Sequence, residues 1–232
     1  LLKTQEGKEA LKYLYSRGLD EEFVKTFYLG LAPSNSGIML SFLKSRGFYL
    51  NTIEVSGPLR RGREFFQERI LFPIRDYRGA IIGFSGRKIQ ESTFGGKYIN
   101  TPETPLFKKS SVLYGLNYCR RRIAKEKKVL IVEGQIDALR LIYEGLNYTV
   151  AGQGTAFGSE GVMTLLQLGV EKVFLGFDGD TAGVEASIKV GDMFQSKGIE
   201  VFVMLFAKDQ DPDALISESG IEGVITSLDN SV

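Results

Sequence analysis

Apolar residues follow two different patterns along the chain, and the change between them divides it into two parts. In the second part, short continuous apolar runs lie at 129–132, 148–151, 173–177 and 200–206. Between these runs, apolar residues recur at helical spacing in 136–143, 161–168 and 182–195. Short apolar runs bounded by turn residues are typical of buried parallel strands. Their alternation with helices predicts an α/β fold, a mostly parallel sheet flanked by helices.

The first part of the chain has a mixed pattern. Helical spacing of apolar residues predicts helices at 6–17, 20–27 and 38–45. The apolar runs 70–75 and 80–84, joined by a turn sequence, predict a β-hairpin. Residues 85–111 are rich in Gly, Ser, Thr, Lys and Pro, which is typical of either disorder or a functional loop region. A basic run at 120–128 is expected to close this α+β part.

Carboxylates follow three of the predicted strands. Glu133 comes directly after the first, Asp178 and Asp180 follow the third, and Asp211 and Asp213 lie a short loop beyond the last. The carboxyl ends of strands in an open α/β sheet meet at one edge, where ligands bind. So many acids at one edge would repel each other unless a cation joins them, and oxygen ligands suit Mg²⁺ or Mn²⁺. A divalent-metal site for phosphoryl transfer is therefore the first hypothesis.

Each acidic cluster also has a purely structural alternative. Glu133 and Asp137 flank the start of a predicted helix, where an acid is favourable at the positive end. Asp178 and Asp180 are separated by one glycine, so both side chains can face one cation, although one of them could simply cap a helix. A turn does not need both acids, which favours metal binding for this pair.

Two other segments are ambiguous on their own. Asp211 and Asp213 flank a proline, which is also typical of a solvated acidic turn. The glycine-containing segment 152–156 follows a strand and could let a phosphate approach the backbone closely, but a plain tight loop explains it equally well. Its spacing does not complete a dinucleotide-binding pattern.

The composition excludes several kinds of chemistry. The chain contains no histidine, which excludes Ser-His-Asp and Cys-His catalysis and histidine-ligated zinc. Its single cysteine, Cys119, allows neither an internal disulfide nor a cysteine-based zinc site. No apolar stretch reaches membrane-spanning length and no signal-peptide pattern is present, so a reduced cytoplasmic setting is expected. The chain begins at Leu1, which predicts a fragment of a longer protein.

The net charge of +1 conceals a strong asymmetry. Residues 60–128 hold 17 Lys and Arg against 6 Asp and Glu, whereas residues 129–232 hold 5 against 16. A basic block beside an acidic block predicts polyanion binding next to a metal centre, although two charged faces could simply attract each other. The candidates for phosphate or base contacts are Arg69, Arg75, Arg87, Lys97, Tyr98 and Lys109. Any one of them could be a solvated surface residue, and it is their clustering in a loop-rich segment that supports function.

The acidic and basic motifs together resemble known families. The sequences 133–137 and 178–180, with the acids at 211 and 213, resemble the Toprim domain of bacterial primases, topoisomerases and some nucleases. The upstream segments resemble the catalytic core of DnaG-type bacterial DNA primases, and they are residues 68–76, 82–87, 97–104, 107–109 and 113–116. The resemblance covers nearly the whole chain, and the combination of motifs is highly specific. One departure is Gln135, where primases often have tyrosine.

The resemblance implies a DNA-dependent RNA polymerase that makes short RNA primers on single-stranded DNA from ribonucleoside triphosphates, by divalent-metal-dependent nucleotidyl transfer. It implies three parts: a basic α+β subdomain over 1–127, a Toprim domain over 128–210 and the start of a truncated C-terminal helical segment over 211–232.

The resemblance also assigns roles to single residues. Glu133 takes the part of general base or metal organiser, and Asp178 and Asp180 are the principal metal ligands. Three further acids are supporting or second-metal ligands: Asp137, Asp211 and Asp213. Two or more Mg²⁺ or Mn²⁺ ions are expected. The basic ridge that guides template or nucleotide phosphates is expected at Arg69, Arg87, Lys97 and Lys109.

The remaining expectations concern partners. Full-length members of the family carry an N-terminal zinc-binding domain and a C-terminal helicase-interacting domain, and neither is expected within this sequence. A replicative helicase is therefore an expected partner only through a domain outside it, at the replication fork in the bacterial cytoplasm, with no membrane partner. Two alternatives stay open: another Toprim enzyme, such as a nuclease or topoisomerase fragment, and a non-catalytic single-strand-binding module.

Overall fold

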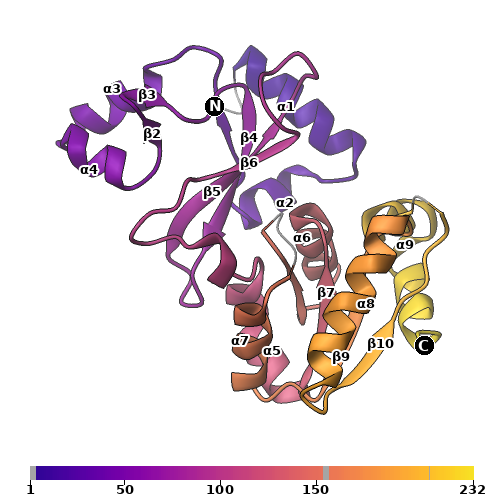
Figure 1. The fold of residues 1–232 in the computed structure, drawn as a ribbon. Helices are drawn as coiled ribbons and strands as arrows, with labels where there is room; N and C mark the ends of the chain where they lie inside the picture. The colour runs from indigo at the N-terminus through magenta and orange to yellow at the C-terminus, as the bar shows by residue number, and fades with distance from the viewer. Residues whose placement is uncertain (1–3, 154–156, 209) are drawn as a thin grey trace. The chain divides into compact units, whose positions relative to one another are not determined.

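A computed structural model describes residues 4–153, 157–208 and 210–232 (Figure 1). Its contacts divide the chain into two compact units. The first holds the residues up to Arg75 together with Ala80–Lys108, and the second holds Asp76–Gly79 together with Lys109–Val232. The basic run at 120–128 thus lies in the second unit, although the sequence pattern had placed it at the end of the first. The functional division at residues 127 and 210 stays a prediction.

The first unit is built on a four-stranded antiparallel sheet in the order β1-β4-β5-β6. Its strands are β1 (Gly30–Ala32), β4 (Arg69–Arg75), β5 (Ile81–Lys88) and β6 (Tyr98–Asn100). The predicted hairpin is confirmed as β4 and β5. The N-terminal helices are also confirmed, as α1 (Gln5–Ser16) and α2 (Glu21–Thr26), which start at the caps Thr4 and Asp20. Part of the segment 85–111 is regular, because β5 continues through it and β6 pairs with β5.

The register of the hairpin shifts between Ile74 and Arg75. Ile74 pairs with Gly83 and Arg75 pairs with Ile81, so the extra residue of this β-bulge is Ile82 of β5. The bulge lies at the carboxyl end of β4, beside Arg75.

A helical and hairpin segment extends from this sheet (Figure 1). It consists of α3 (Ile38–Ser45), α4 (Leu50–Val55) and a two-stranded ribbon of β2 (Leu59–Arg60) and β3 (Arg63–Glu64). Arg61 and Gly62 form the two-residue turn, both with positive φ. Helix α3 matches the predicted range, yet none of its residues is buried.

The second unit confirms the predicted α/β pattern. Its sheet is fully parallel in the order β10-β9-β7-β8. The strands are β7 (Lys128–Val132), β8 (Thr149–Ala151), β9 (Lys172–Gly176) and β10 (Glu200–Val203). The helices are α5 (Leu116–Glu126), α6 (Gln135–Tyr143), α7 (Ser159–Gln167), α8 (Thr181–Gln195) and α9 (Pro212–Asp229). The central strand β7 is completely buried from Val129 to Ile131, as its unbroken apolar run requires in a sheet covered on both sides.

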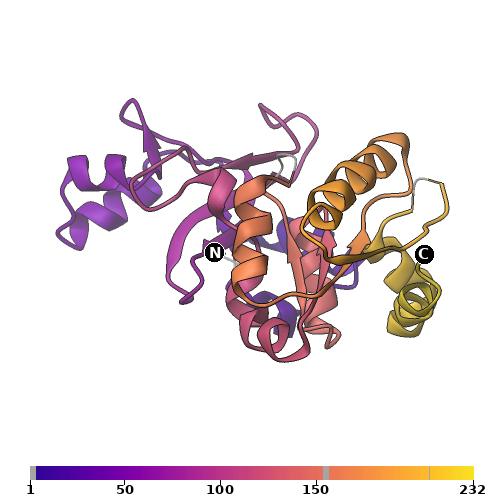
Figure 2. The same ribbon diagram turned by 60° about the horizontal axis from the view of Figure 1, so that its bottom comes forward.

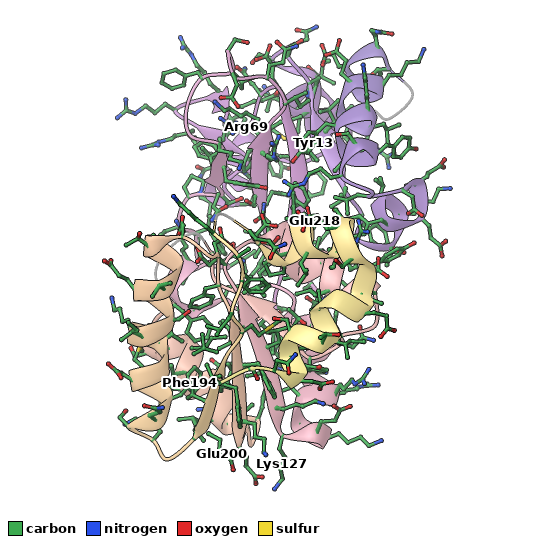
Figure 3. The ribbon with its side chains drawn as sticks, turned by 90° about the vertical axis from the view of Figure 1, so that its right-hand side faces the viewer. Tyr13, Arg69, Lys127, Phe194, Glu200 and Glu218 are labelled. Atoms are coloured by element: carbon green, nitrogen blue, oxygen red, sulfur yellow. The ribbon has the colours of Figure 1, made fainter. Side chains whose placement is uncertain are left out.

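Helices cover both faces of this sheet. Helices α7 and α8 contact each other, and α6 contacts α9. Figures 2 and 3 show α8 and α9 on opposite sides of the strands. Lys127 and Glu200 mark the amino end of the sheet in Figure 3, and Glu218 of α9 lies toward the opposite end. Helix α9 is broken at Gly220, where φ is 66° and ψ is −173°. Within the described part of the chain, no helix is long and apolar enough to cross a membrane.

Candidate metal centre and nucleic-acid-binding residues

Two of the predicted acids meet where β7 and β9 end. These strands are neighbours, and Val132 is paired with Gly176 at their carboxyl ends. Glu133 follows β7 directly and Asp178 follows β9, so the chain leaves both strands at the same edge. The backbone N–H of Asp178 donates a hydrogen bond to Oε1 of Glu133 at 3.2 Å. The meeting of these two strand ends, expected from the sequence, is present.

Three further acids form a compact group. Asp137, Asp211 and Asp213 each offer one carboxylate oxygen, and these three oxygens lie within 4.8 Å of one another. Asp137 lies in the first turn of α6, Asp213 lies in the first turn of α9, and Asp211 is the N-cap of α9. Asp213 is 2% exposed and Asp137 is 8% exposed. Buried like charges at this spacing are unfavourable without a compensating cation, and an all-oxygen donor set fits Mg²⁺ or Mn²⁺.

Asp180 lies outside this three-carboxylate group. It is the N-cap of α8, where its Oδ1 accepts a hydrogen bond from the N–H of Gly183 at 2.7 Å. Asp211 caps α9 in the same way, through the N–H of Ala214 at 2.6 Å. The capping alternative therefore holds for Asp180, and Asp211 is a helix cap as well. A carboxylate has two oxygens, so capping leaves the second oxygen of each available for a cation, and the ligand roles of Asp178 and Asp180 stay predictions.

Glycines allow the close approaches that build this edge. A Cβ on Gly134 would lie 2.1 Å from Oδ2 of Asp137, and a Cβ on Gly179 would lie 2.1 Å from the carbonyl oxygen of Ala207. The N–H of Gly179 donates to the carbonyl of Gln210 at 2.9 Å. This bond ties the turn after β9 to the loop before α9. It explains how acids beyond the last strand come to the same edge. Asp209 and residues 154–156 of the predicted glycine segment 152–156 lie outside the described residues.

Among the basic candidates, Arg69 is corrected by the structure. Its side chain is 1% exposed, and its guanidinium donates to three backbone carbonyls: Gly86 at 3.0 Å, Gly96 at 3.1 Å and Phe94 at 2.7 Å. Burial lowers the pKa of this guanidinium. Figure 3 shows Arg69 within the first unit, close to the sheet. Arg69 therefore holds the segment between β5 and β6 in place, and it does not present its charge to a phosphate.

The other basic candidates remain accessible to different degrees. Arg87 and Tyr98 are direct cross-strand partners on β5 and β6, and Lys97 directly precedes Tyr98 at an exposed position. Arg87 lies over the ring of Tyr13 at 3.8 Å from its centroid, and Arg75 lies over the ring of Tyr28 at 5.2 Å. Neither tyrosine could be predicted as a partner of these arginines, because a local pattern does not reveal which strand a segment packs on. Lys109 belongs to the second unit, so a shared ridge with Arg87 and Lys97 stays a prediction.

Comparison with known proteins accounts for both units. Residues 1–120 match the family model of the DNA primase catalytic core, N-terminal domain, and residues 130–216 match a Toprim-like family model. The DNA primase of Chlamydia pneumoniae is 47% identical over 226 residues, which are 97% of this chain and 38% of that relative. The DNA primase of Staphylococcus epidermidis is 38% identical over 222 residues, which are 93% of this chain and 37% of that relative. The chain thus spans less than two fifths of the length of these relatives.

Solved structures agree with this match. The RNA polymerase domain of Mycobacterium tuberculosis primase DnaG superposes with a TM-score of 0.94 at 32% identity, covering 100% of this chain and 78% of that one. A DnaG primase catalytic domain bound to single-stranded DNA superposes with a TM-score of 0.86 at 31% identity, covering 100% and 74%. The Toprim-type fold expected from the sequence is confirmed by these matches. The chain therefore belongs to the DnaG-type DNA primase family, and it corresponds to part of that family's catalytic core.

Proposed function

We propose that this chain is the core of a primase that synthesises short RNA primers on a single-stranded DNA template from ribonucleoside triphosphates. One observation carries the proposal. Carboxylates from the ends of β7 and β9 and from the starts of α6 and α9 converge at the carboxyl edge of one parallel sheet, in two groups. That is the edge at which open α/β sheets bind ligands.

The acids have separable tasks in this proposal. Asp137, Asp211 and Asp213 are suited to hold a divalent cation, with Asp178 and Asp180 as the ligands of a second site. When bound, Mg²⁺ or Mn²⁺ would lower the pKa of the primer 3′-hydroxyl and neutralise charge on the triphosphate. Glu133, whose Oε1 accepts a hydrogen bond from the N–H of Asp178, would accept the proton of that hydroxyl.

The basic first unit supplies the template-binding function. Arg87, Lys97 and Lys109 would each contact template or nucleotide phosphates, and Tyr98 would stack on a base. The related DnaG catalytic domain bound to single-stranded DNA supports a template-binding role for this chain. A replicative helicase would join through a domain outside this sequence, in the bacterial cytoplasm at the replication fork.

A priming assay tests the proposal. The protein is incubated with single-stranded DNA and labelled ribonucleotides, with Mg²⁺, with Mn²⁺ or with EDTA, and the RNA products are separated. Asp178→Asn and Glu133→Gln should each abolish synthesis and leave DNA binding intact, because the acids act on the reacting atoms whereas affinity comes mainly from basic residues. Glu185→Gln, at an exposed position on α8, is the matched control and should prime normally.

The same assay separates the alternatives. Metal-dependent cleavage of the DNA without RNA synthesis would identify a Toprim nuclease instead. DNA binding without either reaction would leave only a single-strand-binding module. Priming by Asp178→Asn at the wild-type rate would show that the acidic site is assigned wrongly.

A further inference from the structure

Tyr28 occupies a backbone conformation that the chain otherwise gives mostly to glycine. Its φ is 57°, and Arg61, Glu68 and Lys127 are the other non-glycine residues with positive φ among those described. Tyr28 follows the C-cap of α2, and the N–H of Leu29 donates back to the carbonyl of Val24 at 3.0 Å. This is the helix-ending arrangement in which glycine is usual, because a Cβ is strained in the left-handed region.

Packing does not explain the tyrosine. Tyr28 is 70% exposed, so its ring is not part of the core. Its contact is with Arg75, whose guanidinium lies over the ring at 5.2 Å from the centroid. An exposed cation–π contact is weak, of the same order as the strain of a non-glycine residue in this conformation. The two effects roughly cancel, so tyrosine gains no stability over glycine at this position.

The other side of the contact lies beside a second irregularity. The β-bulge of the hairpin falls between Ile74 and Arg75, with its extra residue, Ile82, in β5. Such irregularities are enriched next to functional sites. Two local departures from regular backbone, in segments far apart in sequence, thus lie next to one aromatic ring backed by a guanidinium.

The chemistry of the Tyr28–Arg75 pair indicates which class of ligand it binds. An exposed ring beside a cation offers a stacking surface for a base and a charge for the phosphate next to it, which is how proteins bind single strands without sequence preference. The same unit holds a second such pair, Arg87 over Tyr13 at 3.8 Å, with Tyr98 as the cross-strand neighbour of Arg87. The surrounding sequence, residues 60–128, carries 17 Lys and Arg against 6 Asp and Glu.

We propose that Tyr28, backed by Arg75, is a stacking platform for a base of single-stranded nucleic acid. The inference rests on the proposed template-binding function and adds a residue and a mode of contact to it. Stacking requires the ring and not the hydroxyl, and it requires a base on the ligand. It adds no phosphate contact of its own, because Tyr28 carries no charge.

These properties define the test. Affinity for a fluorescein-labelled oligothymidylate and for an abasic oligomer of the same length is measured by fluorescence anisotropy, with thermal unfolding in parallel. Tyr28→Gly should lower affinity for oligothymidylate about 5- to 150-fold. It should leave affinity for the abasic oligomer and the salt slope unchanged, and it should not lower Tm. Tyr28→Phe should behave as wild type. Tyr49→Ala is the matched control, because Tyr49 is 79% exposed and no guanidinium among the described residues lies over its ring.

Three results would overturn the inference. The first is wild-type affinity of Tyr28→Gly for oligothymidylate. The second is an equal loss for the abasic oligomer, which would indicate a general change of the surface. The third is a loss that Tyr28→Phe shares, since the hydroxyl alone cannot stack. Failure of the proposed function looks different, because the wild-type chain itself would then bind no single-stranded DNA.

Discussion

Arg69 offers a sharp test of whether a basic residue in this chain serves structure or nucleic-acid binding. The change is Arg69→Met, which keeps an unbranched apolar chain in place of the arginine stem and removes the guanidinium donors. In the structure, the guanidinium satisfies the buried carbonyl of Gly86 and the carbonyls of Phe94 and Gly96, which belong to exposed residues. A buried acceptor that loses its donor costs about 1–3 kcal/mol, and a hydrogen bond replaced by water costs about 0.5–1.5 kcal/mol.

One bond of the first kind and two of the second lower the free energy of unfolding by about 4 kcal/mol, taking the middle of each range. The loss should appear in urea unfolding followed by circular dichroism. Because the chain has two units, hydrogen exchange of peptides covering residues 86–100 should show where it occurs. Arg63→Met is the control, since Arg63 is exposed on β3 and should change stability by less than about 0.5 kcal/mol.

The same variant should leave the salt dependence of single-strand binding unchanged at a temperature where it is folded. A phosphate contact on a single strand contributes about 0.7 to the slope of log affinity against log salt. If Arg69→Met keeps its stability and flattens that slope by about 0.7, Arg69 contacts a phosphate and the structural assignment is refuted.

Three further predictions address the site, the template path and the core. Gly179→Ala should abolish primer synthesis, because its Cβ would meet a backbone carbonyl oxygen at 2.1 Å; normal synthesis would show that the turn after β9 can move without cost. Lys97→Ala, Arg87→Ala and Lys109→Ala should each lower single-strand affinity and flatten the slope of log affinity against log salt by about 0.7. Unchanged slopes in all three variants would show that the template does not contact these residues. Burial raises the pKa of the Cys119 thiol from 9.0 to about 12, so the folded state holds this proton where the unfolded state has lost it. The free energy of unfolding should therefore fall as pH rises above 9, by about 1.4 kcal/mol per pH unit, relative to Cys119→Ala; parallel pH profiles for the two proteins would contradict the burial of the thiol.

Sequence patterns predicted the helices and strands in which apolar residues recur at a regular local spacing. The range of α3 was predicted as observed, and β7, α6 and α8 were predicted to within one residue. The short strands β1 and β6 were missed, because three residues carry almost no periodic signal and such strands are defined by the partners they pair with. The last strand ends at Val203 and not at Phe206, since pairing with β9 stops there.

The site was predicted in part for the same reason. Parallel strands fix where their carboxyl ends lie, so the meeting of Glu133 and Asp178 followed from the order of elements. The grouping of Asp137 with Asp211 and Asp213 was implied by the family resemblance and not by the spacing of the residues, because it depends on how α6 packs against α9. The burial of Arg69 depends on a loop returning from 25 to 27 residues further along the chain, a long-range contact that leaves no local pattern.

The position of Asp211 and Asp213 on α9 has a consequence for the order in which the protein folds. The three-carboxylate group draws Asp137 from the first helix of the βα series and its other members from the start of the last helix, so it does not exist until α9 has packed on α6. During synthesis, a nascent chain that has made every strand still lacks the cation site. A divalent ion that binds this site therefore stabilises the assembled unit and none of its earlier intermediates, by an amount that grows with ion concentration. If the backbone amides of α9 become protected during refolding only when the ion is present, the ion binds as this unit is completed.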